Sequence, residues 1–180
     1  MNANNFARHS FDGYLHWNKV RHCSPQHLQY DVYNKLFDLN RFDYIFASVR
    51  NPLDRLFSEF KWHLKNSKDL RIEDFSKWSI ASLSNYESNN YIYDNHLRPQ
   101  SEFLFNGIEV FKHESNFTAE YFSKLLSKRL KLNIVLKPPS ASFNNRNFKE
   151  MPAITQKCLK TIISFYKDDY KLLGYQIPVF

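Results

Sequence analysis

The stretch FASVRNPLDRLFSEF, residues 46–60, decides the fold predicted for this chain. It overlaps an almost unbroken apolar run, FDYIFASVR at 42–50, which has the length of a strand and lacks the alternation of a half-exposed one. Such a run is typical of a strand buried on both faces of a parallel sheet. Asn51 and Pro52 then end the strand and suit the start of a helix, whose apolar residues keep helical spacing up to position 64.

The rest of the chain alternates helical and strand-like segments. Helices are expected at 24–37, 72–83, 117–130 and 153–173, the last of them closed by Gly174. Strands are expected at 108–114 and 132–137, and polar loops at 84–101 and 138–152. This order predicts an α/β fold in which helices flank a parallel sheet. No repeat, low-complexity tract or linker interrupts the sequence, so we expect a single domain over residues 1–180.

Composition narrows the classes of partner. The 180 residues carry a formal charge of +7, from 25 Lys and Arg against 18 Asp and Glu, which suggests an anionic partner. The stretch 124–137 holds five basic residues and no acidic one, so it is either a solvated helix face or part of an anion-binding surface. Because no nucleic-acid-binding motif is present, nucleic-acid binding stays a minor hypothesis.

Membrane, secretion and cysteine signals are weak. No run of about 18 apolar residues predicts a transmembrane helix, and residues 1–13 lack the apolar core of a signal peptide. The only two cysteines, Cys23 and Cys158, lie far apart, which favours a reducing compartment. Neither has the nearby second Cys of a zinc motif, so no metal is expected. We therefore expect a cytoplasmic protein, free or peripheral at the membrane, from an AT-rich bacterial genome.

The junction between the strand and the following helix carries the clearest chemical signal. Open α/β folds bind ligands at the C-terminal edge of the sheet. A helix that starts there offers backbone N–H groups and the positive end of its dipole, both suited to phosphate. Arg50 adds a guanidinium that can hold a phosphate through two hydrogen bonds, and Ser58 adds a hydroxyl two turns later. The alternative is a structural Arg50 that pairs with an acid such as Asp54.

The segment RNPLDRLFS resembles the 3′-phosphate-binding motif of the sulfotransferases, in which a Ser follows the strand-end Arg by eight residues. The match is to the membrane-associated carbohydrate sulfotransferases of the chondroitin and heparan type and their bacterial relatives. Four more segments resemble the family in the same order: RHCSPQHL (21–28), YDNHLRPQSEFL (93–104), FKHE (111–114) and FYKDDYKLLGY (165–175). The resemblance covers about residues 20–176 and implies a P-loop-NTPase-like sulfotransferase fold.

The resemblance also implies a reaction. A sulfuryl group would pass from 3′-phosphoadenosine 5′-phosphosulfate, the donor, to a hydroxyl of an oligo- or polysaccharide. Arg50 and Ser58 would hold the 3′-phosphate of the donor. His22 would be the general base that takes the proton of the acceptor hydroxyl, because a His titrates near operating pH. His27, five residues later, is the rival for this role.

Three polar residues, His96, Arg98 and Gln100, lie in the segment that resembles the chondroitin-type enzymes. Two interpretations of them stay open. They contact the carbohydrate acceptor, or they hydrogen-bond within the protein and fix the loop around the cleft.

Two arginines are further candidates for donor binding. Arg55 lies one turn before Ser58 and either adds charge to the phosphate site or pairs with Glu59 or Asp54. Arg146, in the long loop before the last helix, is expected to close over the nucleotide.

One element of the family is missing from this sequence. Family members carry an N-terminal loop of the type Pro-Lys-Thr-Gly-Gly-Thr-Ser, which follows their first strand and cradles the 5′-phosphosulfate. Residues 1–20 hold one Gly and one Lys, Gly13 and Lys19, in no such order. Without the loop, the leaving phosphate lacks preorganised charge stabilisation, usually the largest catalytic effect. Three hypotheses stay open: an N-terminally truncated chain, an inactive remnant that binds nucleotide or sugar, and replacement of the loop by another basic segment.

Overall fold

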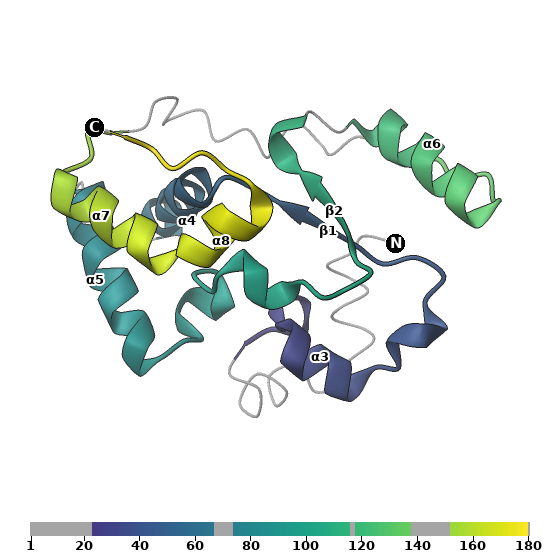
Figure 1. Ribbon diagram of the computed structural model, residues 1–180, viewed down its shortest axis with the longest axis horizontal. Helices are drawn as coiled ribbons and strands as arrows, with labels where there is room; N and C mark the ends of the chain where they lie inside the picture. Colours follow the sequence, from purple (N-terminus) through teal and green to yellow (C-terminus); the bar gives the residue numbers. More distant parts are fainter. Residues whose placement is uncertain (1–22, 67–73, 116–117, 138–151, 180) are drawn as a thin grey trace.

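The computed structural model describes residues 23–66, 74–115, 118–137 and 152–179 (Figure 1). Its helical and strand elements, in chain order, are η1 (Pro25–His27), α3 (Tyr30–Leu36), η2 (Leu39–Arg41), β1 (Phe46–Val49), α4 (Pro52–Asn66), α5 (Phe75–Ser88), η3 (Ile92–Asn95), η4 (Gln100–Phe103), β2 (Glu109–Lys112), η5 (His113–Ser115), α6 (Ala119–Leu130), α7 (Gln156–Phe165) and α8 (Lys167–Leu173), where η marks a 3₁₀-helix. The predicted mixed α/β class is confirmed at this level.

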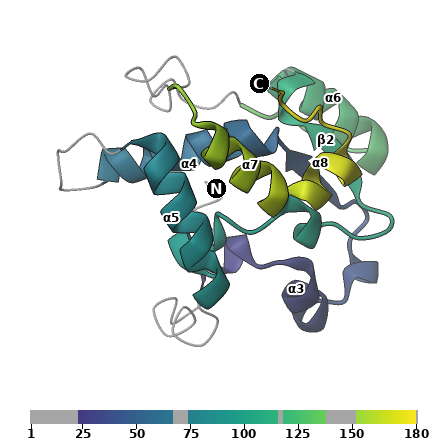
Figure 2. The same cartoon turned by 60° about the vertical axis from the view of Figure 1, so that its left-hand side comes forward.

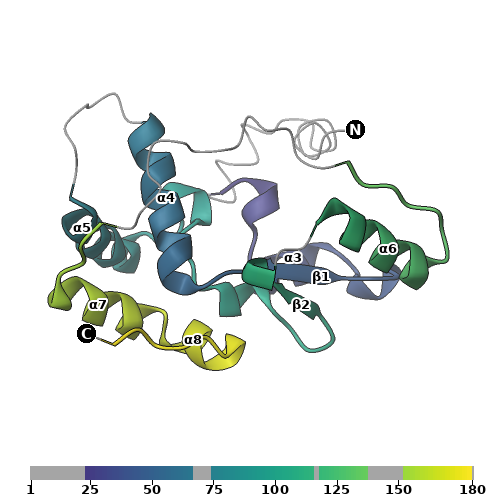
Figure 3. The ribbon, with the colours of Figure 1, turned by 90° about the horizontal axis from the view of Figure 1, so that it is seen from above.

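The sheet consists of two parallel strands within the described residues. Strand β1 pairs with β2 in a register that sets Phe46 opposite Glu109 and Val49 opposite Lys112. The parallel pairing was predicted, but burial of β1 on both faces is wrong, because Phe46 and Ser48 are exposed. The strands lie between helices α4, α5, α7 and α8 on one side and α6 on the other (Figures 1 and 3). The P-loop-like arrangement of a larger sheet is not confirmed.

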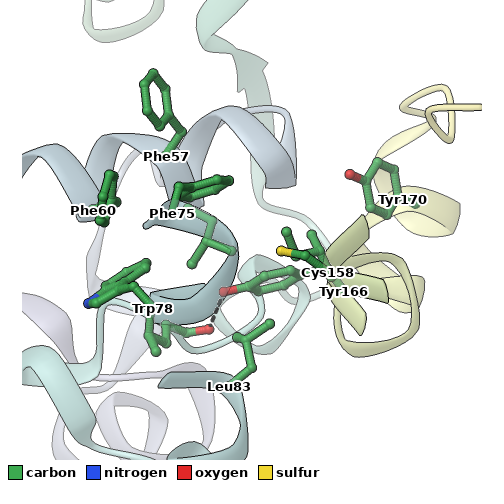
Figure 4. Packing of buried hydrophobic residues seen from close by; sticks show 11 residues of the cluster. Phe57, Phe60, Phe75, Trp78, Leu83, Cys158, Tyr166 and Tyr170 are labelled. Atoms are coloured by element: carbon green, nitrogen blue, oxygen red, sulfur yellow. Dashed lines mark hydrogen bonds between the residues drawn. The ribbon is translucent and has the colours of Figure 1, made fainter. Parts of the chain in front are cut away.

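The hydrophobic core is built mainly by helices. Side chains from α4, α5, α7 and α8 form one buried cluster around Phe60, Trp78 and Ile162 (Figure 4). Helices α5 and α7 lie side by side within this group (Figure 2). The core also includes Leu97, whose carbonyl accepts a hydrogen bond from the Tyr166 hydroxyl at 2.9 Å, drawn dashed in Figure 4. The hydrogen bond from Tyr166 therefore connects the segment before η4 directly to the helical core.

Helix α6 lies apart from that core and contacts the sheet through Phe122. The Phe122 ring lies 5.6 Å from the ring of Phe46 and 5.4 Å from that of Phe111, measured between centroids. The strand expected at 132–137 is wrong. Its backbone bonds to serine hydroxyls of α6 instead: the Ile134 N–H donates to Ser127 Oγ at 2.9 Å. These hydroxyls provide hydrogen-bond partners for backbone groups of 132–137 that would otherwise need a neighbouring strand.

Other predicted boundaries need correction. The helix expected at 24–37 is a short 3₁₀ turn followed by α3. The loop expected at 84–101 begins with the end of α5, contains the 3₁₀ turn η3 and ends at the start of η4. The helix expected at 153–173 breaks into α7 and α8 at Tyr166, whose ψ of 23° leaves the helical range. Gly174 ends α8 with a φ of 63°, as predicted. No helix in the described part of the chain is long and apolar enough to cross a membrane.

Candidate functional site

A cavity of about 270 Å³ opens beside β1. It brings together segments that are far apart in the sequence: the end of η1, the strand β1, the helix α4 and the turn before η4. Its lining comprises Gln26, His27, Ala47, Ser48, Val49, Arg55, Asn95, His96, Gln100, Phe103 and Leu104. Four predicted site residues, His27, Arg55, His96 and Gln100, therefore line one cavity.

The His27 side of the cavity is fixed by a carboxylate. Ser24 precedes η1 but does not cap it with its side chain. Instead, Ser24 donates its N–H to Asp94 Oδ1 and its hydroxyl to Asp94 Oδ2, both at 2.6 Å. His27 Nδ1 lies 2.9 Å from Asp94 Oδ2 and 2.8 Å from the Ser24 hydroxyl. Asp94 thereby orients the imidazole of His27.

An unusual backbone turn delivers Asp94 to this place. Tyr93, Asp94 and Asn95 all have left-handed conformations, with φ of 52°, 55° and 72°. Each such residue other than Gly costs about 1–2 kcal/mol, so the surroundings must offset several kcal/mol. Asn95 is buried and contributes to that offset by donating to the carbonyl of His27 at 2.6 Å. Strained backbone of this kind is typical of functional sites.

A second histidine–carboxylate pair faces the first. His96 Nδ1 lies 2.8 Å from Glu59 Oε2, and His96 Nε2 lies 3.1 Å from His27 Nε2. The two rings meet edge to face, with 4.3 Å between centroids. The result is a continuous line of hydrogen bonds from Asp94 through His27 and His96 to Glu59.

The pKa values of the first pair are shifted in directions that follow from these contacts. Burial lowers the pKa of His27, as does the adjacent His96, and the hydrogen bonding to Asp94 and the negative charge of Asp94 offset this only in part. Burial alone would raise the pKa of Asp94, but the hydrogen bonds that it accepts from Ser24 and His27 outweigh burial and lower it. At neutral pH, His27 is therefore biased towards its uncharged form next to an ionised Asp94.

The ligand atoms of His27, Asp94 and His96 lie within 4.8 Å of one another, a spacing at which they could hold a metal ion. Asp94 contacts the Nδ1 edge of His27, whereas His96 contacts the Nε2 edge. A metal ion bound by the Nε2 atoms of His27 and His96 would therefore not contact Asp94, which would hydrogen-bond to the opposite edge of the His27 ring. Two nitrogens remain, fewer than the three protein ligands of a catalytic zinc. The arrangement fits a proton chain better than a metal centre.

Arg98 and Gln100 serve the turn itself. Arg98 is only 6% exposed, and its Nε donates to Asn95 Oδ1 at 2.7 Å. Gln100 bonds through its side chain to both backbone groups of Arg50, at 2.8 and 2.7 Å. The backbone N–H of Gln100 donates to Asp169 on α8 at 2.8 Å. These contacts favour loop fixation over acceptor contact for both residues, although Gln100 also lines the cavity.

The helix start expected to hold phosphate is already largely occupied. The Asn51 N–H donates to Glu114 Oε1 at 2.6 Å, and the Leu53 N–H donates to the Asn51 side chain at 3.0 Å. Pro52, between them, has no N–H. Burial would raise the pKa of Glu114, but its hydrogen bonds, including the one from Asn51, lower it. A phosphate at this helix start would have to displace an ionised carboxylate.

The three predicted phosphate ligands on this segment differ in position. Arg55 lines the cavity and donates to the carbonyl of Arg98 at 2.8 Å. Arg50 lies near Tyr175, whose hydroxyl bonds to Glu114. Burial and Glu114 raise the pKa of Tyr175, and the positive charge of Arg50 opposes this rise. Ser58 is half-buried on α4 and is not among the residues that line the cavity.

Two predicted residues, His22 and Arg146, lie outside the described residues. The hydrogen-bond network around His27 and His96 includes four residues that were not predicted as site residues: Ser24, Glu59, Asp94 and Asn95. Asp94 could have been found, because it lies two residues before His96 in the segment YDNHLRPQSEFL that resembles the family. Glu59 gave no such signal, since a Glu on an amphipathic helix is usually solvated.

Comparison with known proteins gave no match: no family model, no curated protein and no solved structure is similar enough to this chain to show a relationship. Function must therefore be argued from the site itself.

Proposed function

We propose that this chain is a sulfotransferase that uses 3′-phosphoadenosine 5′-phosphosulfate to modify a hydroxyl of a carbohydrate. One observation supports the proposal most: the five segments that resemble the family, from different parts of the sequence, hydrogen-bond to one another. A chance resemblance in five separate segments gives no reason for those segments to bond to one another, or for three of them (21–28, 46–60 and 93–104) to line one cavity.

The contacts run through all five segments. Segment 21–28 meets segment 93–104 through Ser24, His27 and Asp94. Segment 46–60 meets 93–104 through Arg50 and Gln100. Segment 111–114 contributes Glu114, which bonds to Asn51 and to Tyr175 of the last segment.

His27 is our choice for the general base. It lines the cavity, Asp94 orients it, and its lowered pKa favours the uncharged form that can accept a proton. In the proposed reaction the acceptor oxygen bonds to sulfur while the bond from sulfur to the 5′-phosphate oxygen breaks. The hydroxyl proton passes to the base, and 3′-phosphoadenosine 5′-phosphate leaves. We expect the cavity to hold the reacting groups only, since its volume lies just below the roughly 300–1,000 Å³ of complete ligand sites.

We expect Arg55 to be the main contact of a phosphate of the donor, and Arg50 and Ser58 to make further contacts from the same segment. Arg55 is the basic residue of this segment that lines the cavity. A charge-assisted contact contributes about 1.5–3 kcal/mol, so loss of the guanidinium should weaken binding roughly 10- to 100-fold.

The test is calorimetric titration of the chain with 3′-phosphoadenosine 5′-phosphate, beside 5′-AMP. The proposal predicts binding that requires the 3′-phosphate and that Arg55→Ala weakens. Arg41→Ala is the matched control, since the Arg41 side chain is 85% exposed on η2. Equal affinity for both nucleotides, or equal losses in the two variants, would contradict the proposal.

Two observations favour a second candidate, an inactive relative that binds nucleotide or sugar without turnover. Glu114 occupies the helix start where a phosphate was expected, and no segment of the 5′-phosphosulfate loop type was found in residues 1–20. Binding of 3′-phosphoadenosine 5′-phosphate, without sulfate transfer to any of a panel of polysaccharides, would favour this candidate.

A further inference from the structure

The four residues Asp94, His27, His96 and Glu59 form a line, called here the proton chain. Three hydrogen bonds join them: Asp94 to His27 at 2.9 Å, His27 to His96 at 3.1 Å, and His96 to Glu59 at 2.8 Å. Each bond requires one proton between its two heavy atoms. Two neutral imidazoles supply two protons, and two carboxylates supply none. A proton chain with all three bonds formed therefore holds one proton more than the two neutral imidazoles supply.

Burial makes this additional proton necessary for Glu59. The Glu59 side chain is about one-tenth exposed, and its second oxygen, Oε1, is buried without a hydrogen-bond partner among the described residues. A buried carboxylate is costly unless a neighbouring cation or a bound proton compensates its charge. The proton on the His96 side of the chain provides that compensation.

We infer that Asp94, His27, His96 and Glu59 bind one proton jointly, and that Glu59 and His96 are positioning residues that set the protonation of His27. The second clause rests on the proposed function, in which His27 is the base. The first clause does not, because it follows from the hydrogen-bond geometry alone. Such a shared proton titrates as a property of the whole chain and not of one residue.

The hydrogen bonds of the proton chain limit how His27 can act as a base in the proposed reaction. Both nitrogens of His27 are occupied in this state, Nδ1 by Asp94 and Nε2 by His96. His27 can accept a proton from a substrate hydroxyl only if its bond to His96 opens, which frees the Nε2 of His27. When a second proton is bound, each histidine is an imidazolium paired with its own carboxylate, so charge stays balanced.

Three other titratable or charged groups face the proton chain. Arg55 lines the same cavity, Arg98 bonds to Asn95 next to Asp94, and Cys23 is buried near Asp94. Arg98 is paired with Glu102. Burial raises the pKa of Cys23 to about 11, so this thiol does not titrate in the range where histidines do.

The experiment is a pH titration of the imidazole ¹⁵N signals in the full chain. We expect the signals of His27 and His96 to move with one common midpoint. In Glu59→Gln, the amide oxygen can still accept the His96 Nδ1–H, but the neutral amide has no charge to stabilise the additional proton, so the common midpoint should move to lower pH. Glu87→Gln, on an exposed position of α5, is the matched control and should change neither signal.

Independent midpoints for His27 and His96 in the unsubstituted chain would overturn the inference, whether or not Glu59→Gln folds. An unchanged common midpoint in a folded Glu59→Gln variant would overturn it as well. These readouts need neither donor nor acceptor, so they are distinct from failure of the proposed function. If turnover is found, Glu59→Gln should lower kcat about tenfold or more and shift its pH profile, with little change in KM.

Discussion

Asp169 offers the sharpest test of how the site is held in place. It is fully buried on α8, and its two oxygens accept the backbone N–H groups of Gln100 and Ser101, each at 2.8 Å. Asp169→Ala leaves both N–H groups buried without an acceptor. Hydrogen bonds to a charged group contribute about 1.5–3 kcal/mol each, which gives about 3–6 kcal/mol for the pair.

Removal of the buried charge recovers part of its desolvation cost, so the lower end, about 3 kcal/mol, is expected. That is a large part of the roughly 5–15 kcal/mol that stabilises a typical domain. For a chain of this length it corresponds to a fall in Tm of roughly 6–12 °C.

The assay is urea unfolding followed by circular dichroism, with thermal melts in parallel. Asp168→Ala is the matched control, because Asp168 is the neighbouring acid and is exposed. The control should stay within about 0.5 kcal/mol of the unsubstituted chain. If Asp169→Ala is no more destabilising than Asp168→Ala, the role assigned to Asp169 in fixing the 93–104 segment is refuted.

Three further predictions concern stability and reactivity. Lys131→Gly should raise the free energy of unfolding by about 1 kcal/mol, because exposed Lys131 ends α6 with a φ of 54°; urea unfolding measures it, and a destabilised variant would contradict it. The lowered pKa of His27 means that the unfolded chain binds a proton first as pH falls. The free energy of unfolding should therefore fall as pH drops through about 6.5, the ordinary His value, and less so in His27→Asn. Buried Cys23, with its pKa raised by burial and by Asp94 to about 11, should react slowly with iodoacetamide at pH 8 and rapidly once unfolded; mass spectrometry of the alkylated chain decides.

Local signals in the sequence predicted the parts of the fold that depend on near neighbours. Asn51 and Pro52 mark the start of α4, and Gly174 marks the end of α8, because capping and left-handed φ are properties of a few residues. The strand at 46–49 was found inside the predicted run at 42–50. Its two-sided burial was wrong because burial depends on which elements pack against a strand, and that is not encoded locally.

Long-range contacts explain the remaining differences. The segment 132–137 has the composition of a strand, but the Ser123 and Ser127 hydroxyls of α6 satisfy its backbone. The left-handed turn at 93–95 contains no Gly, and it is stabilised by partners nearly 70 residues away in the sequence, such as the carbonyl of His27. Propensity alone would not predict such a turn.

Some residues of the site could be predicted from the sequence, and others depend on long-range contacts. His27, Arg55, His96 and Gln100 were proposed from the sequence, and the structure brings them to one cavity. Glu59 was missed because its role depends on His96, which lies 37 residues further along the chain. A carboxylate becomes informative only when its partner and its burial are known.

The proposed function requires that a donor nucleotide binds with its reacting end in the cavity lined by His27, His96 and Arg55. The most direct measurement is a titration of the ¹⁵N-imidazole-labelled chain with 3′-phosphoadenosine 5′-phosphate, observed by NMR. The His27 and His96 signals should shift together with one Kd, while the signal of exposed His113 should not move. Binding that leaves His27 and His96 unchanged, or no binding by a chain that melts cooperatively, would contradict the proposed function.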